Sequence, residues 1–340
     1  SFRFGPSATL SGTTSLFSIR EGKQFVFEGT DGTARLETAG KQGAVIDLRS
    51  LNPGAAPDLT VRRLGLRGNL GISGNPASRY NAEAGGLGTF HVESCRFEAK
   101  QTAIAFNQAS VRRLRVRDSD FSGGARKGIW VPCPIEEGAF VTGNRLIDIG
   151  LTAIQLGGGK AGQIDDGALD WISGVTVHEN QILGGGKAAD ETVAYIFGIL
   201  VYGTNVSIQG NIVRDFNRGE PVPGERIGHH FKMADGSWHR GPWVYPDNRP
   251  RRRLAGAAIY AKAQYGIIAN NVCTRSGWRS VIEVKTGGRR PYFMVSNNMV
   301  DGSSLAIDDS FGFEADTARA LWSQNLVVNM PHEALKSMAG

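Results

Sequence analysis

The sequence predicts an all-β protein, a single-stranded right-handed parallel β-helix (solenoid) with long loop insertions. Three observations support this fold class: the glycine content, a repeated asparagine motif and a repeated isoleucine motif. The 340 residues include 46 glycines and 9% aromatic residues. Because glycine is costly inside helices and common in tight turns, this composition favours short strands joined by turns.

The first motif is an asparagine followed two residues later by an apolar residue, as in Asn180-Gln181-Ile182. A strand-like alternation of apolar and polar residues precedes it, as in Val175-Thr176-Val177-His178. The motif asparagines are Asn144, Asn180, Asn211, Asn271, Asn298 and Asn325, and Cys95 and Ser119 hold the same place in two degenerate copies. Asparagines at equivalent turns can bond to one another and to the next backbone, so we expect a structural ladder.

The second motif is a small residue, an isoleucine, any residue and an apolar residue, as in Gly128-Ile129-Trp130-Val131. Its anchors are Ile104, Ile129, Ile154, Ile199, Ile259, Ile282 and, more loosely, Leu305. The first three anchors are 25 residues apart, and each interval holds one strand of the asparagine motif and one of the isoleucine motif. A single coil cannot bury its own apolar face, but coils stacked about 4.8 Å apart share a continuous interior. This is the repeat of a β-solenoid.

From about Leu59 to Val328, these Asn-x-Ile/Val turns and Gly-Ile-x-Val strands resemble the repeats of the pectate-lyase-like superfamily. The resemblance implies the fold. That superfamily includes polysaccharide lyases, polygalacturonase-type hydrolases, epimerases, phage tailspikes and non-enzymatic adhesins. The function must therefore be argued from the site.

The predicted organisation has three parts. Residues 1–51 are expected to form an N-terminal cap and irregular first coils, residues 52–330 the parallel β-helix, and residues 331–340 a C-terminal cap or tail. Caps hide the edges of the end strands, which would otherwise pair with other chains.

Long insertions interrupt the later coils, because the anchor spacing rises to 45 residues before Ile199 and to 60 before Ile259. We place the insertions near 157–171, 184–195 and 217–254. Loops longer than about 12–15 residues are commonly functional or disordered. The second and third insertions leave the coil at the same point, between the asparagine turn and the isoleucine strand, so they are expected to wall one groove.

Aromatic and basic residues in and near the largest insertion suit sugar stacking and the binding of acids. The substrate-binding candidates are Tyr202, His229, His230, Trp238, His239, Trp243, Arg289 and Arg290. The histidines match no metal-ligand signature, so we expect no metal site, although calcium could bridge an acidic sugar to the protein.

Alternate residues of a strand face outwards, so the isoleucine strands present two outward columns. The late members of both columns carry chemistry and are expected to share one exposed face. With Arg279 nearby, the catalytic candidates are Lys285, Lys262, Tyr260, Glu283, Asp308 and Arg279. Neighbouring lysines repel each other, and a lysine in its neutral form can take a proton, unless an adjacent carboxylate pairs with it.

These residue types predict a carbohydrate-active enzyme that cleaves an acidic polysaccharide by β-elimination. Arg279, Lys262 and Lys285 suit charge neutralisation and proton removal, and Tyr260 or Tyr202 suits the leaving oxygen. The segment Glu283-Val284-Lys285-Thr286 is similar to the lysine-bearing strand of alginate and chondroitin lyases of this fold. The arginine that those families place on the following coil is absent from Ser303–Asp309.

Two alternatives stay open. A glycoside hydrolase needs two carboxyl groups about 5–9.5 Å apart, which Glu283 with Asp308 or Asp309, or the pair Asp165 and Asp166, could supply. The ordered motifs of polygalacturonases are absent from the sequence. A non-catalytic glycan-binding phage-tail or surface protein is the other alternative.

The net charge of +6 is modest and its arginine cluster is local, so nucleic acid is not an expected partner. We expect an anionic polysaccharide or oligosaccharide as partner, a monomer or homotrimer, and no membrane span. An extracellular or periplasmic location is expected, although the chain shows no signal peptide. The three cysteines fit neither a metal site nor a closed disulfide framework.

Overall fold

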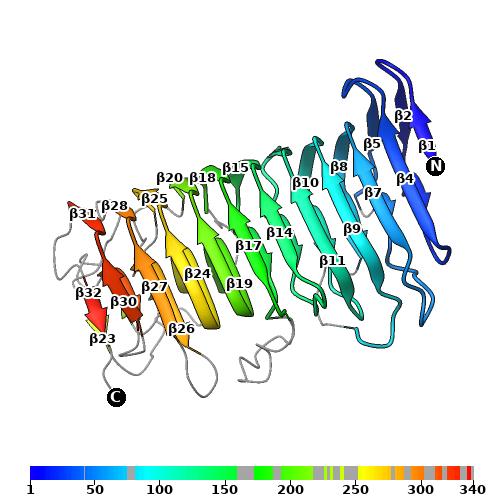
Figure 1. The fold of residues 1–340 in the computed structure, drawn as a ribbon. Coiled ribbons are helices and arrows are strands. Elements are labelled where there is room, and N and C mark those ends of the chain that lie inside the picture. The colour runs from blue at the N-terminus through cyan, green and yellow to red at the C-terminus, as the bar shows by residue number, and fades with distance from the viewer. Residues whose placement is uncertain are drawn as a thin grey trace.

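A computed structural model gives the structure of the protein. It describes residues 1–41, 43–74, 81–158, 172–186, 193–216, 226–227, 230–232, 238–240, 252–276, 280–286, 292–301, 311–315, 320–329 and 335–337. The regular elements in these ranges are β-strands, which stack side by side into an elongated solenoid (Figure 1). The predicted parallel β-helix is confirmed. No helix in the described ranges is long and apolar enough to cross a membrane.

Each coil contributes one strand to each of three sheets, and consecutive strands of a sheet pair in parallel. The front sheet, which faces the viewer in Figure 1, carries the strands that precede the asparagine turns. It contains β1 (Phe2–Phe4), β4 (Gln24–Gly29), β7 (Asp58–Arg62), β9 (Leu87–Glu93), β11 (Val111–Arg117), β14 (Ala139–Thr142), β17 (Val175–His178), the second halves of β19 (Val193–Gln209) and β24 (Arg252–Ala269), β27 (Tyr292–Ser296) and β30 (Ala320–Ser323).

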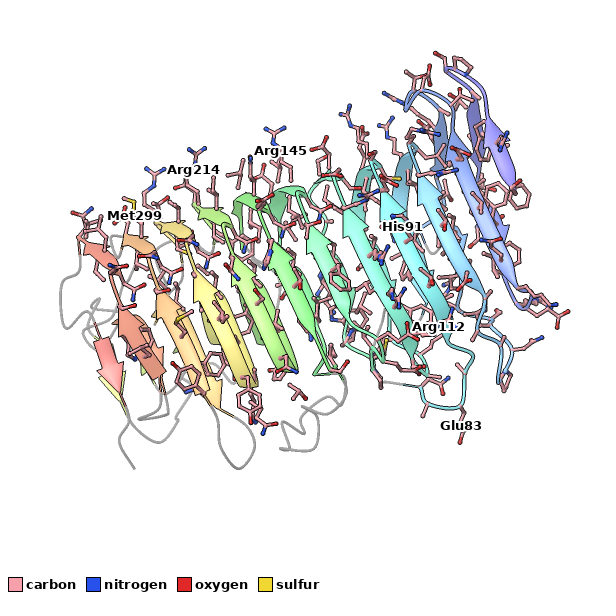
Figure 2. All side chains as sticks on the ribbon, viewed as in Figure 1. Glu83, His91, Arg112, Arg145, Arg214 and Met299 are labelled. Atoms are coloured by element: carbon pink, nitrogen blue, oxygen red, sulfur yellow. The ribbon has the colours of Figure 1, made fainter. Side chains whose placement is uncertain are left out.

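The top sheet follows the asparagine turns and runs along the upper edge of Figure 1. It contains β2 (Thr9–Gly12), β5 (Arg35–Thr38), the first halves of β8 (Gly65–Gly74) and β10 (Arg96–Phe106), β12 (Asp120–Ser122), β15 (Arg145–Ile149), β18 (Gln181–Gly185), β20 (Ile212–Arg214), β25 (Val272–Thr274), β28 (Met299–Asp301) and β31 (Leu326–Val328). Its outward side chains include Arg145, Arg214 and Met299, which project from this edge (Figure 2).

The isoleucine sheet closes each coil at the back. It contains β3 (Phe17–Ser18), β6 (Ala44–Asp47), the second halves of β8 and β10, β13 (Lys127–Val131), β16 (Thr152–Leu156), the first halves of β19 and β24, β26 (Ser280–Thr286), β29 (Phe311–Ala315) and β32 (Leu335–Ser337). The strands of residues 1–51 and β32 thus pair in the same three columns as the rest of the solenoid.

Apolar side chains from all three sheets fill the interior. In the front sheet, one inward column is occupied throughout by aromatic or β-branched residues and is fully buried from Phe27 to Val295. Its members are Phe27, Val61, Val92, Val116, Val141, Val177, Ile208, Ile268 and Val295. β-branched side chains pack well on a pleated surface, which explains why the strands form here.

The asparagine ladder is present as predicted. The buried Asn211 donates from Nδ2 to Asn271 Oδ1 (3.0 Å) and to the Val177 carbonyl (2.8 Å), while its Oδ1 accepts from the Asn180 amide (3.0 Å). The same pattern repeats along the column. The residue before each asparagine has a positive φ, as in Glu179 (57°), a conformation that turns the chain sharply between sheets.

The two degenerate copies also belong to this ladder. The Ser119 hydroxyl accepts a hydrogen bond from the Cys95 amide (3.0 Å), and the Ser119 amide donates to Asn144 Oδ1 (3.1 Å). The Cys95 thiol in turn lies within reach of the Glu93 carbonyl (3.3 Å). A hydroxyl and a thiol therefore replace the amide in the earlier coils.

Three long segments separate strands of the later coils. Residues 159–171 lie between β16 and β17, residues 187–192 between β18 and β19, and residues 217–251 between β20 and β24. Within the last of these, β21 (Arg226–Ile227) pairs in parallel with β24, and β22 (His230–Lys232) pairs antiparallel with both β21 and β23 (Trp238–Arg240). The largest insertion is therefore tied to the strand that carries Tyr260 and Lys262.

Candidate functional site

The isoleucine strands stack in the predicted register as far as β26. Ile104, Ile129, Ile154, Ile199, Ile259 and Ile282 pair in succession and are fully buried. The outward residues consequently form two columns. One runs through Trp130, Gln155, Leu200, Tyr260 and Glu283, and the other through Tyr202, Lys262 and Lys285.

The predicted register of the last coil is wrong. Ile282 pairs with Phe313, not with Leu305, and Glu283 pairs with Glu314. The strand of this coil therefore begins later in the sequence than its small-Leu-x-apolar motif indicated. Asp308 was placed in the lysine column on the basis of that motif, and it lies outside the described residues.

The face is also buried, although we expected it to be exposed. Tyr202, Tyr260, Lys262 and Glu283 each expose only 8% of their surface. Part of the reason is aromatic packing on the outer side of the sheet. The Tyr202 and Tyr260 ring centroids are 5.9 Å apart, and Phe197 lies 5.2 Å from Tyr260. Together with Leu200 and Ala257, these three rings form a second apolar cluster, which we call the outer cluster.

Glycines on the preceding coil make room for the outer cluster. Gly157 and Gly158 both have positive φ angles (75° and 81°). A Cβ at Gly158 would lie 2.7 Å from Tyr202 Cε2, closer than real carbon contacts allow. The absence of side chains at this turn therefore leaves space for the Tyr202 ring.

Two lysines border the outer cluster. Lys262 and Lys285 are direct neighbours on adjacent strands, at the same position of the register. Lys285 Nζ lies 3.3 Å from Glu283 Oε1, and its side chain retains 22% of its exposure. The carboxylate beside the lysines thus forms an ion pair, one of the two arrangements that the sequence allowed. A buried ammonium group is stabilised by such a partner.

The aromatic surface extends further toward the N-terminus than sequence reasoning indicated. Trp130 Nε1 donates to Gln155 Oε1 (2.9 Å), and Lys127 Nζ lies 3.6 Å from the centroid of the Trp130 ring. Trp130 belongs to the same column as Tyr260, three strands away. Its outward position was visible in the sequence register, but a single tryptophan among small residues gave no reason to select it.

The remaining candidates are only partly placed. His230 lies in β22, and Trp238 and His239 lie in β23, paired across the small antiparallel sheet. His229, Trp243, Arg279, Arg289 and Arg290 lie outside the described residues, as does the pair Asp165 and Asp166.

The described residues contain neither a metal-ligand cluster nor a reactive cysteine. No group of three or more His, Cys, Asp or Glu side chains there is arranged to hold a metal ion. Cys95, Cys133 and Cys273 are free and buried, and burial raises the pKa of each thiol to about 12. A thiol with so high a pKa is a poor nucleophile.

The outer cluster, its two lysines and Glu283 therefore bring three kinds of chemical group together: aromatic faces, cationic groups and a carboxylate. Comparison of the chain with protein-family models, curated proteins and solved structures found no match. The parallel β-helix is the level at which the chain can be classified, and any function has to follow from its side chains.

Proposed function

We propose that this protein is a polysaccharide lyase that cleaves an acidic polysaccharide by β-elimination. The observation that carries the proposal is the placement of Lys262 beside Lys285 on adjacent coils, with Tyr260 and Glu283 paired on the same two strands. Lysine and tyrosine side chains can supply the charge neutralisation, the base and the acid that such a reaction needs.

β-Elimination removes a proton from C5 of a uronic acid residue and breaks the C4–O bond, leaving a C4–C5 double bond. The substrate carboxylate has to be neutralised, because the proton leaves from the carbon beside it. The ammonium group of Lys285 suits that role through a charge-assisted hydrogen bond. Lys262 in its neutral form suits the role of base, and the Tyr260 hydroxyl that of acid for the leaving oxygen.

The ion pair between Lys285 and Glu283 gives this proposal a definite binding step. Lys285 retains the larger exposed fraction of the two partners, so an incoming sugar would meet it first. A uronate carboxylate would take the place of Glu283 as the partner of Lys285, and the tyrosine rings would offer faces for stacking.

The test is a panel of uronate polymers, with ultraviolet absorbance of the unsaturated product as readout. The wild-type protein is expected to act on at least one polymer, and Lys285→Ala to lose at least 100-fold in rate, the usual scale for one group that stabilises charge in the transition state. Lys23→Ala, which removes an exposed lysine before β4, is the matched control. Absence of product across the panel, or equal rates for both variants, would refute the proposal.

Glycoside hydrolysis is a second candidate, because Glu283 and Glu314 are register neighbours on adjacent coils. Adjacent strands lie about 4.8 Å apart, close to the separation of about 5–5.5 Å that retaining glycosidases use. New reducing ends without ultraviolet absorbance would favour this reaction, and Glu314→Gln should then abolish it. For either reaction the partner is an acidic polysaccharide, which would be met outside the cytoplasm.

A further inference from the structure

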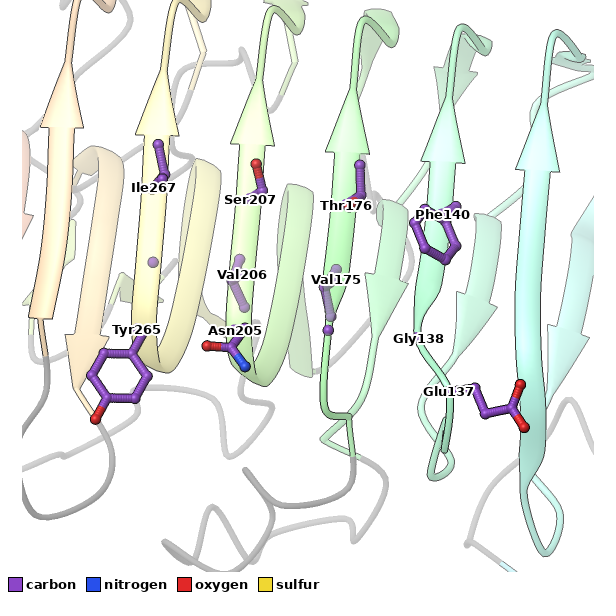
Figure 3. Close-up of a pocket in the computed structure, with 12 residues that line it drawn as sticks. Glu137, Gly138, Phe140, Val175, Thr176, Asn205, Val206, Ser207, Tyr265 and Ile267 are labelled. Atoms are coloured by element: carbon purple, nitrogen blue, oxygen red, sulfur yellow. The ribbon is translucent and has the colours of Figure 1, made fainter.

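A shallow groove of about 340 Å³ crosses the front sheet, a different sheet from the one that carries the outer cluster. It spans four neighbouring strands, β14, β17, β19 and β24 (Figure 3). Phe140 stands at one end and Tyr265 at the other, and both are exposed, at 41% and 43%. We call it the front groove. Its volume falls within the usual range of small-ligand sites, about 300–1,000 Å³.

Three glycines line the front groove: Gly138, Gly174 and Gly266. A Cβ added at Gly174 would meet no atom within 4 Å, so the space above this residue is empty. A Cβ at Gly266 would instead overlap the buried Phe293 ring, so this glycine makes room in the interior and not in the groove. The missing side chain at Gly174 therefore contributes to the open space of the groove.

Polar groups alternate with the apolar walls. Phe140, Thr176, Ser207 and Ile267 form one outward column in register, so a hydroxyl group recurs on each of the two middle strands. Equivalent groups in such a column are about 4.8 Å apart. Asn205 also lines the groove, and its Nδ2 donates to the Ser173 carbonyl (3.0 Å).

Neighbouring side chains hold the Ser207 hydroxyl in place. His178 Nε2 lies 2.8 Å from Ser207 Oγ, and Gln209 Nε2 donates to the same oxygen (2.7 Å). Burial lowers the pKa of His178 below its usual value, with Glu179 opposing that shift, and so favours the neutral imidazole. The middle of the groove is thus an ordered and uncharged array of hydrogen-bonding groups.

Charge in the front groove is already balanced. Among its lining residues Glu137 is charged, and Glu137 Oε2 pairs with Arg113 Nη2 at 2.6 Å. The Arg115 guanidinium lies 5.9 Å from the centroid of the Phe140 ring. Glu137 is the one charged residue among the twelve that line the groove, and its carboxylate is already paired.

We propose that the front groove binds a short, uncharged oligosaccharide. A sugar ring has apolar C–H faces, which stack on aromatic rings, and a rim of hydroxyl groups, which pair with Thr176, Ser207 and Asn205. The size of the groove suits a small ligand better than a protein partner. Twelve residues line the groove, whereas a stable protein interface uses about 20–30 residues on each side.

The experiment is a glycan array that contains neutral cello-, xylo-, malto- and chito-oligosaccharides together with uronate oligosaccharides, followed by calorimetry on the best neutral glycan. Phe140→Ala and Tyr265→Ala should each weaken that binding about tenfold, the loss expected for one stacked ring. Gly174→Gln fills the empty space above Gly174 and should abolish binding. Leu326→Ala is the control, because it removes an exposed apolar side chain from the top sheet.

Each outcome decides the matter. The proposal is supported if the three groove variants weaken binding of the neutral glycan and the control variant binds it normally. The proposal is overturned if no neutral glycan binds, if the groove variants bind normally, or if they alter the oligomeric mass instead. Because Lys285→Ala should bind the neutral glycan normally, failure here and failure of the proposed lyase activity can be told apart.

Discussion

The early and late halves of the front sheet share one interior but have different outer surfaces. From β1 to β11 the column nearest the asparagine turn reads Arg3, Glu28, Arg62, Glu93 and Arg117, and from β14 to β27 it reads Thr142, His178, Gln209, Ala269 and Ser296. From β4 to β27, each residue of the inward column beside it is a buried valine, isoleucine or phenylalanine.

The early surface is closed by its own ion pairs. Glu28 pairs with Arg3 (3.7 Å), Arg62 (2.9 Å) and Arg63, and Glu93 pairs with Arg117 (2.5 Å). The late surface has short polar and apolar side chains and contains the front groove. The difference shows that the inner repeat specifies the solenoid and leaves the outer columns free to differ. Binding sites should therefore be sought where the outer columns stop pairing with themselves.

The largest effect is expected in the ladder, where Cys95 and Ser119 of the earlier coils hold the place of the later asparagines. Asn211→Leu would remove partners from the Asn180 amide and the Val177 carbonyl, both buried, and should lower the free energy of unfolding by about 3–6 kcal/mol. Ser119→Ala leaves one amide, that of Cys95, without its acceptor and should cost about 1–2 kcal/mol.

Urea denaturation followed by circular dichroism would measure both losses. Gln181→Ala, which truncates an exposed side chain one residue after a ladder asparagine, is the control and should change little. Equal losses for Asn211→Leu and Ser119→Ala would show that the asparagine ladder contributes no more than a single hydroxyl.

A second comparison concerns two glycines of the front groove. Gly266→Ala should destabilise the protein by about 1–3 kcal/mol, since its methyl group overlaps the buried Phe293 ring. Gly174→Ala meets nothing and should fall within about 0.5 kcal/mol of the wild type. Thermal unfolding of the two variants would measure both changes in stability. A large loss of stability for Gly174→Ala would mean that the space above Gly174 is filled.

Acid should weaken the early half selectively. Burial raises the pKa of Glu28, but hydrogen bonding to Arg62 and the charges of Arg62, Arg63 and Arg3 outweigh it, so the pKa lies below the ordinary 4.5. A lowered carboxyl pKa stabilises the fold above pH 4.5, and this contribution is lost as pH falls through the folded-state value. The stability difference between wild type and Glu28→Gln should therefore shrink below pH 4.5 in urea titrations. A constant difference would contradict the ion-pair account.

The smallest expected effect separates the two histidines of the front sheet. Burial lowers the pKa of both; at His91, Glu93 opposes this while nearby arginines add to it, and at His178 Glu179 opposes it. Glu93→Gln should lower the pKa of His91 further and leave that of His178 unchanged. Ring-proton NMR titrations would follow both residues in one sample, and a matching shift at His178 would rule out a local cause.

Much of the fold could be predicted from the sequence, because both repeats are determined by local chemistry. Asparagine turns and isoleucine anchors gave the register from Ile104 to Ile282, and even Cys95 and Ser119 were placed in the right column. The register failed in the last coil because both Leu305 and Phe313 offer apolar alternation, and which of them pairs depends on the length of the preceding loop.

The site was less predictable, for physical reasons. The outward columns of Tyr260 and Lys262 followed from the register, but their burial depends on neighbours distant in sequence, such as Phe197 against Tyr260. The front groove was missed because Phe140 and Tyr265 are 125 residues apart and become the ends of one feature only when the coils stack. Ile267, an apolar residue in an outward column of small polar ones, was the signal that could have revealed it.

The most direct test of the account is a crystal structure of the full chain soaked with oligosaccharides from depolymerised pectate and alginate. The account predicts an acidic sugar against Tyr202, Tyr260, Lys262 and Lys285, with its carboxylate in place of Glu283 beside Lys285 Nζ. An acidic sugar bound over the ion-paired early coils, or no sugar on the isoleucine sheet at all, would contradict it.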